Sequence, residues 1–247
     1  MTIAHVTWEI FMTLVIITAL GVGLATLFGG VLGFVFRGVA LKYGDAMMAL
    51  SSGVMLACSF TSLIIPAFEL ARSPYTVALG IMLGGGVIFL FDKVIRRFDI
   101  GGCDDKRHIV LFVLAMALHN IPEGIASGVG FGLGDTSRAL SIAVSVAVQN
   151  IPEGMVIIAP LLSLGISEKK TFLIALLTGG VEVVGAFLGY FFISGLSSLL
   201  PLALSFAGGT MVYVIYSETP CEEGGGGAVG MIFLLGTALM LLFSAIV

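Results

Sequence analysis

Two short segments of the chain repeat one chemical pattern, LHNIPEG at positions 118–124 and VQNIPEG at positions 148–154. Each places a glutamate, Glu123 or Glu153, inside a long apolar stretch, where an ionisable side chain is costly and therefore a functional candidate by default. Residues four apart share a helical face, so His119 lies on the face of Glu123 and Gln149 on the face of Glu153. Imidazole, amide and carboxylate groups are ligands of divalent transition metals. The repeated pattern therefore predicts a metal site.

The composition indicates an integral membrane protein. Hydrophobic residues make up 58% of the 247 residues and charged residues 11%, with a mean hydropathy of +1.16. Soluble domains average about 25% charged residues. A membrane bundle would use almost the whole 25.7 kDa chain. We therefore expect one transmembrane domain, residues 1–247, with no separate soluble catalytic or nucleic-acid-binding domain.

The apolar segments predict an all-α bundle of eight transmembrane helices, because a helix needs about 20 apolar residues to cross the hydrocarbon core. The expected helices run over about Thr7–Phe36, Ala46–Leu70, Tyr75–Asp92, His108–Phe131, Arg138–Leu164, Thr171–Ile193, Leu199–Ser217 and Ala228–Val247. The connections between them are short, so the bundle should be compact.

The basic residues predict the orientation of these helices. Nine of the eleven Lys and Arg residues follow the first, third and fifth predicted helices, and only Arg72 and Arg138 lie on the other side. The positive-inside rule places the side with nine basic residues in the cytoplasm, so both termini should be extracytoplasmic. Cys103 and Cys221 would then face the reducing cytoplasm, where disulfides are rare.

Three glutamates should lie near the middle of the membrane. Glu123, Glu153 and Glu182 are each about 16 Å from a helix end at 1.5 Å per residue, in a core about 30 Å thick. No Lys or Arg lies at that depth in the fourth, fifth or sixth predicted helix. Clustered carboxylates in a low dielectric must be protonated, hydrated or balanced by an external cation. A divalent cation balances them best.

The paired motifs, Glu182 on the following helix and the eight-helix plan with both ends outside resemble the ZIP family of divalent metal transporters, most closely its prokaryotic branch. The resemblance implies a permease of the bacterial cytoplasmic (inner) membrane that moves zinc, or iron, manganese or cadmium, toward the cytoplasm. It implies a binuclear metal site between the fourth, fifth and sixth helices. It also implies no enzymatic activity, no cofactor beyond the transported metal, and divalent ions and the lipid bilayer as partners. A homodimer is compatible with this plan.

The resemblance assigns site residues by position. One metal would bind His119, Glu123, Gln149 and Glu153, and the neighbouring one Asn120, Glu123, Asn150, Glu153 and Glu182. Met55 and Ser59 match pore-lining positions of the family, and Glu69 matches an acid at its outer entrance. Many relatives have His or Asp where this chain has Gln149 and Asn150, so we expect one tight and one weaker metal position.

Two other classes of function match parts of the pattern. An intramembrane metalloenzyme would also use His and Glu, but such enzymes typically carry His-Glu-x-x-His, and here Pro122 interrupts the turn after His119. A proton-coupled transporter of a neutral or cationic solute could use the glutamates as proton carriers. Imidazole and carboxylate suit zinc, iron, manganese and cadmium alike, so these ligands do not rank the metals.

Overall fold

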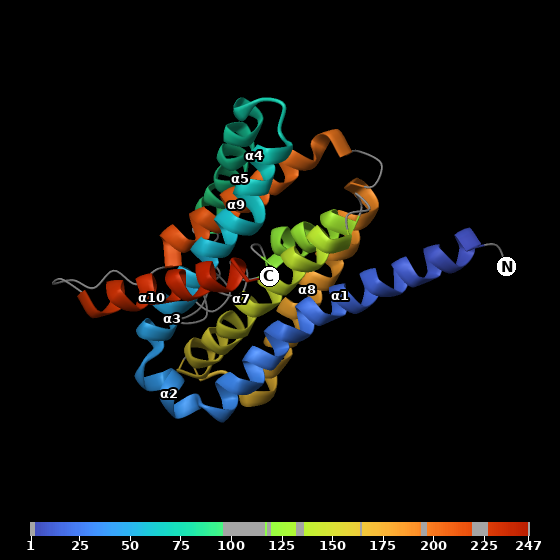
Figure 1. The fold of residues 1–247 in the computed structure, drawn as a ribbon. Helices are drawn as coiled ribbons and strands as arrows, with labels where there is room; N and C mark the ends of the chain where they lie inside the picture. Colours follow the sequence, from blue (N-terminus) through green and yellow to red (C-terminus); the bar gives the residue numbers. More distant parts are fainter. Residues whose placement is uncertain are drawn as a thin grey trace.

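A computed structural model describes residues 3–95, 117, 120–131, 136–163, 165–193, 197–218 and 227–246, which are almost entirely helical and contain no strand. Its long helices are α1 (Ile3–Val35), α3 (Gly44–Cys58), α5 (Pro74–Ile95), α7 (Thr136–Ser163), α8 (Glu168–Ile193), α9 (Leu200–Glu218) and α10 (Gly227–Ser244), together with a helical segment over residues 120–131 (Figure 1). The shorter elements are α2 (Arg37–Lys42), the π-helix η1 (Ser59–Ile64), α4 (Ile65–Leu70) and the 3₁₀ turn η2 (Ser197–Leu199).

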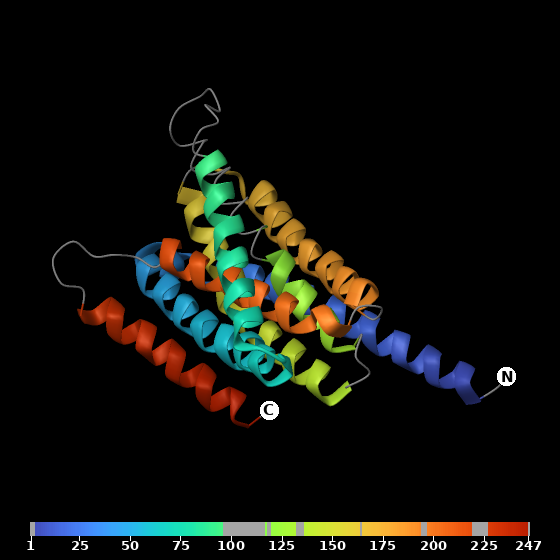
Figure 2. The ribbon, with the colours of Figure 1, turned by 90° about the horizontal axis from the view of Figure 1, so that it is seen from above.

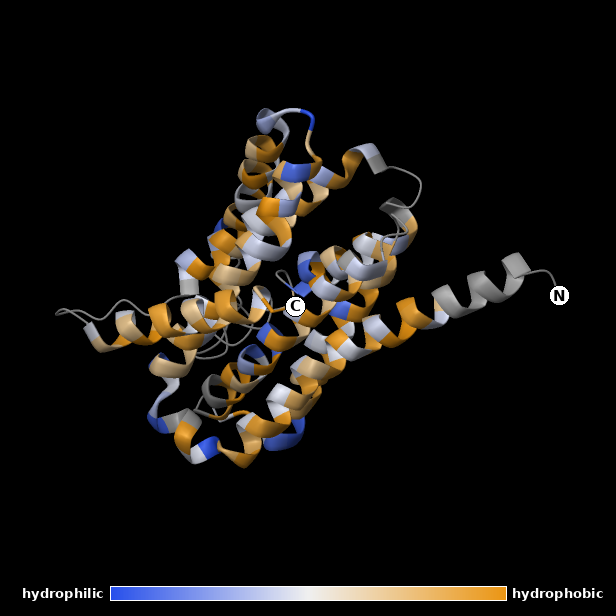
Figure 3. Cartoon of the chain, viewed as in Figure 1, coloured by the Kyte–Doolittle hydropathy of each residue, from blue (hydrophilic) through white to orange (hydrophobic). Residues whose placement is uncertain are grey.

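The predicted all-α membrane class is confirmed. Seven stretches of the described residues are long and apolar enough to cross a membrane. Large apolar side chains such as Leu24, Leu177 and Leu242 are more than half exposed, as suits contact with lipid, and Figure 3 shows hydrophobic residues over most of the helices. The predicted fourth helix, His108–Phe131, is described only at residue 117 and over 120–131. The count of eight therefore stays a prediction.

The second predicted helix, Ala46–Leu70, is wrong as one continuous α-helix. It begins at Gly44, widens into η1 and resumes as α4. Pro66 removes a backbone N–H, and its ring clashes with the carbonyl four residues back. The Ser59 and Thr61 hydroxyls also donate to the carbonyls of Leu56 and Ala57, which draws those carbonyls away from the regular ladder. These effects favour a local π-helical turn.

The helices form two groups, as Figures 1 and 2 show. The first group contains α1, residues 120–131, α7 and α8, and the second contains α3, α4, α5, α9 and α10. Glycines let the backbones approach closely within each group. A Cβ on Gly29 would meet the backbone of Ile151, and a Cβ on Gly84 would meet that of Phe206. Among the described residues, the largest contact between the groups is that of α3 with α7.

The ends of the helices agree with the predicted alternation of spans. Arg37 Nη1 lies 2.7 Å from Glu168 Oε1, so the connection after α1 adjoins the start of α8. Glu69, Ser137 and Ser244 line one cavity, so the ends of α4 and α10 adjoin the start of α7. The choice of cytoplasmic side stays a prediction from the loop charges.

Candidate metal site

Six polar residues from three helical segments meet inside the first group. They are Asn120 and Glu123 from residues 120–131, Gln149, Asn150 and Glu153 from α7, and Glu182 from α8. Each side chain is at most 3% exposed. Glu123 and Glu182 both lie within electrostatic range of Glu153. His119 lies outside the described residues.

Glu182 is held by donors from three other helical segments. Asn120 Nδ2 donates to Glu182 Oε1 at 2.7 Å, and Asn150 Nδ2 donates to Glu182 Oε2 at 2.6 Å. Thr26 Oγ1 on α1 donates to Oε1 at 2.6 Å. Hydrogen bonds to a carboxylate are about twice as strong as neutral ones, and a low dielectric strengthens them further. This carboxylate therefore fixes the orientation of one asparagine from each motif.

The two motifs are also joined directly. Gln149 Nε2 on α7 donates to Glu123 Oε1 at 2.5 Å. Because Nε2 is the donor, the amide of Gln149 directs its nitrogen toward Glu123 and its oxygen away. The same reasoning applies to Asn120 and Asn150 beside Glu182.

Four buried oxygens of this site have no donor among the described residues. None of the described residues donates a hydrogen bond to Asn120 Oδ1, Glu123 Oε2, Gln149 Oε1 or Asn150 Oδ1. Leaving a buried polar atom unsatisfied costs about 1–3 kcal/mol, and native structures contain few of them. All four orphan atoms are acceptors. A cation would satisfy them together, because carboxylate and carbonyl oxygens are metal ligands.

The described carboxylates do not form a metal site by themselves. Among the described residues, no three His, Cys, Asp or Glu side chains are close enough to hold one ion by themselves. A metal at this site would therefore require the orphan amide oxygens, or the imidazole of His119.

The glycine that ends each motif positions a neighbouring helix. A Cβ on Gly124 would meet the backbone of Glu182, and a Cβ on Gly154 would meet the backbone of Thr26. The two equivalent glycines thus bring in the two residues, Glu182 and Thr26, that hydrogen-bond to each other. The sequence pattern contained these glycines at matching positions, and only the packing assigns them a role.

Thr26 was missed by sequence reasoning, because its only signal is a hydroxyl within an apolar helix. We predict that Thr26→Val destabilises the protein by about 1.5–3 kcal/mol, the range for a hydrogen bond to a charged group. Val keeps the shape and removes the donor. Thermal and denaturant unfolding in detergent measure the loss. Thr18→Val, half-buried on the same helix, is the matched control, and equal stability of the two variants would contradict the prediction.

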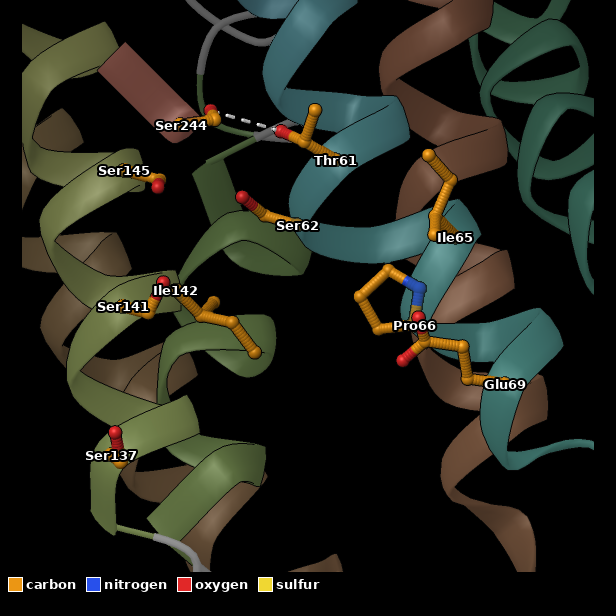
Figure 4. A pocket seen from close by; sticks show the side chains of 10 residues that line it. All are labelled: Thr61, Ser62, Ile65, Pro66, Glu69, Ser137, Ser141, Ile142, Ser145 and Ser244. Atoms are coloured by element: carbon orange, nitrogen blue, oxygen red, sulfur yellow. Dashed lines mark hydrogen bonds between the residues drawn. The ribbon is translucent and has the colours of Figure 1, made fainter. Parts of the chain in front are cut away.

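The three weaker predicted positions lie on α3 (Met55), η1 (Ser59) and α4 (Glu69). Met55 is 5% exposed in the apolar cluster that α3 shares with α7 and α9, and Ser59 is fully buried with its hydroxyl on the carbonyl of Leu56. Glu69 lines a cavity at the end of α4. Met55 and Ser59 therefore lie where the two helix groups meet. Glu69 lies in the wall of the cavity at the end of α4 (Figure 4).

The membrane-spanning helices around buried carboxylates and amides define a transporter-like membrane protein, and comparison with known proteins identifies its family. The family model described as ZIP Zinc transporter matches residues 104–218. The chain is 37% identical to zinc transporter GufA of Myxococcus xanthus over 180 residues, which cover 67% of this chain and 71% of GufA. It is 31% identical to zinc transporter ZIPB of Bordetella bronchiseptica over 208 residues, which cover 78% of this chain and 67% of ZIPB. It is 32% identical to zinc transporter ZupT of Chlorobaculum parvum over 256 residues, which cover 89% and 94% of the two chains.

This chain therefore belongs to the ZIP family, and the resemblance predicted from the paired motifs is confirmed. The family consists of metal transporters and not of enzymes. The metalloenzyme alternative is set aside for that reason.

Proposed function

We propose that this protein carries divalent transition-metal cations, with zinc the foremost, across a bacterial cytoplasmic membrane toward the cytoplasm. The observation that carries the proposal is the set of four buried oxygens on residues 120–131 and α7 to which no described residue donates a hydrogen bond. The names of the relatives support zinc as the substrate. We further propose that residues 1–247 act as one transmembrane domain.

The proposed site holds two metals. One would bind Glu123, Gln149 and Glu153 together with His119. The other would bind Asn120 and Asn150 through Oδ1, with Glu123, Glu153 and Glu182. Both oxygens of Glu182 already accept hydrogen bonds, which supports a role in aiming the two asparagine oxygens until a metal displaces a donor.

Transport would proceed by sliding the first helix group against the second. Backbone contacts through glycine make each group stiff, as at Gly29 and Gly84. The contact between groups instead runs through the side chains of α3 and α7 around Met55. Met55 and Ser59 would line the path at this boundary. Binding all ligands to the metal requires ionised carboxylates and neutral imidazole, so metal binding should displace protons.

The proposed function is tested by metal uptake into proteoliposomes that contain the purified protein. Zinc should accumulate, and iron, manganese and cadmium, added one at a time, should compete to an extent that ranks the metals. Absence of metal uptake, with uptake of an organic cation driven by a proton gradient, would favour the proton-coupled alternative. Peptidase activity of the same preparation would revive the enzyme alternative.

The two metal positions should differ in affinity. Asn150→Asp replaces a neutral ligand by a carboxylate, so we expect the weaker site to tighten about tenfold, which is about 1.4 kcal/mol, and to release more protons on binding. Calorimetric zinc titrations in buffers of different ionisation enthalpy measure both effects. The protein without this substitution should show one tight and one weaker zinc site in the same titration. Two equal sites, or an unaltered titration of the variant, would contradict this prediction.

The orientation can be tested with the native loop cysteines. Impermeant thiol reagents applied to intact cells should not label Cys103 or Cys221, because both would face the cytoplasm. A cysteine introduced at either terminus should be labelled. Labelling of both native cysteines from outside would reverse the orientation and with it the proposed direction of import.

A further inference from the structure

The short helix α2 connects the two helix groups at one end of the bundle (Figure 1). It follows α1 of the first group, precedes α3 of the second group, and contacts both of these helices and α7. Among the connections between the groups, it is the one that the structure describes from end to end. Any sliding of one group against the other must therefore be accommodated at α2 and its two ends.

The neighbours of α2 indicate its depth in the membrane. The candidate span in α1 ends at Val35 and the next one begins at Gly44, so α2 lies where the chain leaves the hydrocarbon core and re-enters it. Phe36, Val39 and Tyr43 are each about half exposed. A helix that lies at the membrane surface buries such side chains at the boundary between headgroups and acyl chains. These features are typical of an interfacial helix.

Four exposed basic residues accompany these apolar side chains. They are Arg37, Lys42, Lys169 and Lys170. The guanidinium of Arg37 lies 2.7 Å from the carboxylate of Glu168, which brings the start of α8 beside α2. The acids of residues 36–45 and 168–170 are Asp45 and Glu168, so positive charge is in excess there. Figure 3 shows hydrophilic and hydrophobic residues side by side at this end of the bundle.

We propose that α2 and the start of α8 bind the headgroups of anionic phospholipids. The lysine ammonium groups would contact the phosphates, and Phe36, Val39 and Tyr43 would lie among the upper acyl chains. A soluble anionic partner would satisfy the charges but would leave these apolar side chains without an apolar environment. The positive-inside rule predicts that this end faces the cytoplasm, and the cytoplasmic leaflet carries anionic lipids.

The bound lipids would hold α2 at the membrane surface while the helix groups slide. A Cβ on Gly38 or Gly44 would meet nothing within 4 Å, so neither glycine is held in a close backbone contact. The exposed ion pair of Arg37 with Glu168 ties α2 to the first group, but such pairs are weak. Lipid headgroups would supply a stronger anchor. Zinc uptake should then depend on anionic lipid, and this part of the inference rests on the proposed function.

The lipid contact is tested with a tryptophan reporter and brominated lipids, whose bromine atoms quench nearby tryptophan fluorescence. Trp8 is replaced by Phe, so that Tyr43→Trp supplies the single tryptophan. The affinity of this position for brominated phosphatidylglycerol should exceed that for brominated phosphatidylcholine by about threefold or more. Raising the salt concentration should reduce the preference, because salt screens exposed charges.

Phe191→Trp in the same background is the matched control. Phe191 is 60% exposed near the other end of α8, and α8 contains no Lys or Arg after Lys170. A reporter at this position should show equal affinity for the two lipids.

Replacing Lys42, Lys169 and Lys170 together by Gln should abolish the preference at position 43. The control reporter at position 191 should not change. Equal affinity for the two lipids at position 43 would overturn the inference and would assign the basic residues to a soluble anionic partner. A preference that survives the three lysine substitutions would overturn it as well.

Zinc uptake supplies a second measurement. The initial rate should rise about twofold or more when phosphatidylglycerol replaces part of the phosphatidylcholine in the proteoliposomes. The variant without the three lysines should lose this dependence, which separates the lipid contact from a general attraction of zinc to an anionic membrane. Equal rates in both membranes would contradict the role of lipid in sliding. A protein that prefers the anionic lipid but takes up no zinc would contradict the proposed function and support the lipid-binding surface.

Discussion

Glu153→Gln should fold normally and lose most zinc uptake, by at least tenfold. The substitution removes one anionic ligand and one competing proton while keeping nearly the same shape. In the proposed site Glu153 binds both metals, so its loss weakens both positions together. Initial rates of zinc uptake into proteoliposomes measure the defect, and the variant should also release fewer protons for each metal bound.

Glu168→Gln is the matched control for this prediction. Glu168 lies at the start of α8 in an exposed ion pair with Arg37, and exposed pairs contribute about 0–1 kcal/mol. Its variant should transport zinc at nearly the normal rate. If Glu153→Gln took up zinc at the rate of the unmodified protein and with the same dependence on pH, α7 would not carry the metal. The proposed site would then be wrong.

Gly154→Ala should destabilise the protein by about 1–3 kcal/mol, the usual cost of overpacking a tight contact. The added Cβ would collide with the backbone carbonyl of Thr26 on α1, which cannot rotate away as a side chain could. Separating α1 from α7 would also move Thr26 away from Glu182, so uptake should fall with stability. Unfolding in detergent and uptake per folded molecule measure the two effects.

Gly124→Ala should behave in the same way, because its Cβ would meet the backbone of Glu182. Gly21 provides the matched control, since a Cβ there meets nothing within 4 Å. Replacing a helical glycine by alanine at such an open position should stabilise the helix by about 0.5–1 kcal/mol. Equal effects at positions 21, 124 and 154 would show that the motif glycines act through helix propensity and not through packing.

Sequence reasoning reached the membrane class, the approximate spans and the paired motifs because these depend on local properties. Hydropathy over about 20 residues identifies a membrane helix, since every residue of that window meets the same solvent. Residues four apart share a face in any helix, so Gln149 and Glu153 could be placed together without coordinates. The expectation that Glu123, Glu153 and Glu182 approach one another followed from their equal depth.

The sequence did not reveal the partners that these faces meet. Thr26 on α1 and Glu182 on α8 are 156 positions apart in the sequence. Their helices become neighbours only when the chain folds. The widening of the second predicted helix at Ser59–Ile64 depends on how Pro66 and two hydroxyls compete for carbonyls. The cavity lined by Glu69 likewise combines residues of η1, α4, α7 and α10.

The sequence by itself determined that Glu123, Glu153 and Glu182 lie at membrane depth in helices that carry no Lys or Arg at that depth, because residue types and positions along the helices suffice for that conclusion. Only the tertiary structure decided how they are held. Two carboxylates take the available amide and hydroxyl donors, which leaves the oxygens of Asn120, Gln149 and Asn150 directed elsewhere. Such an arrangement depends on the distances between side chains of different helices, and helical periodicity specifies a face but not the neighbour that packs against it.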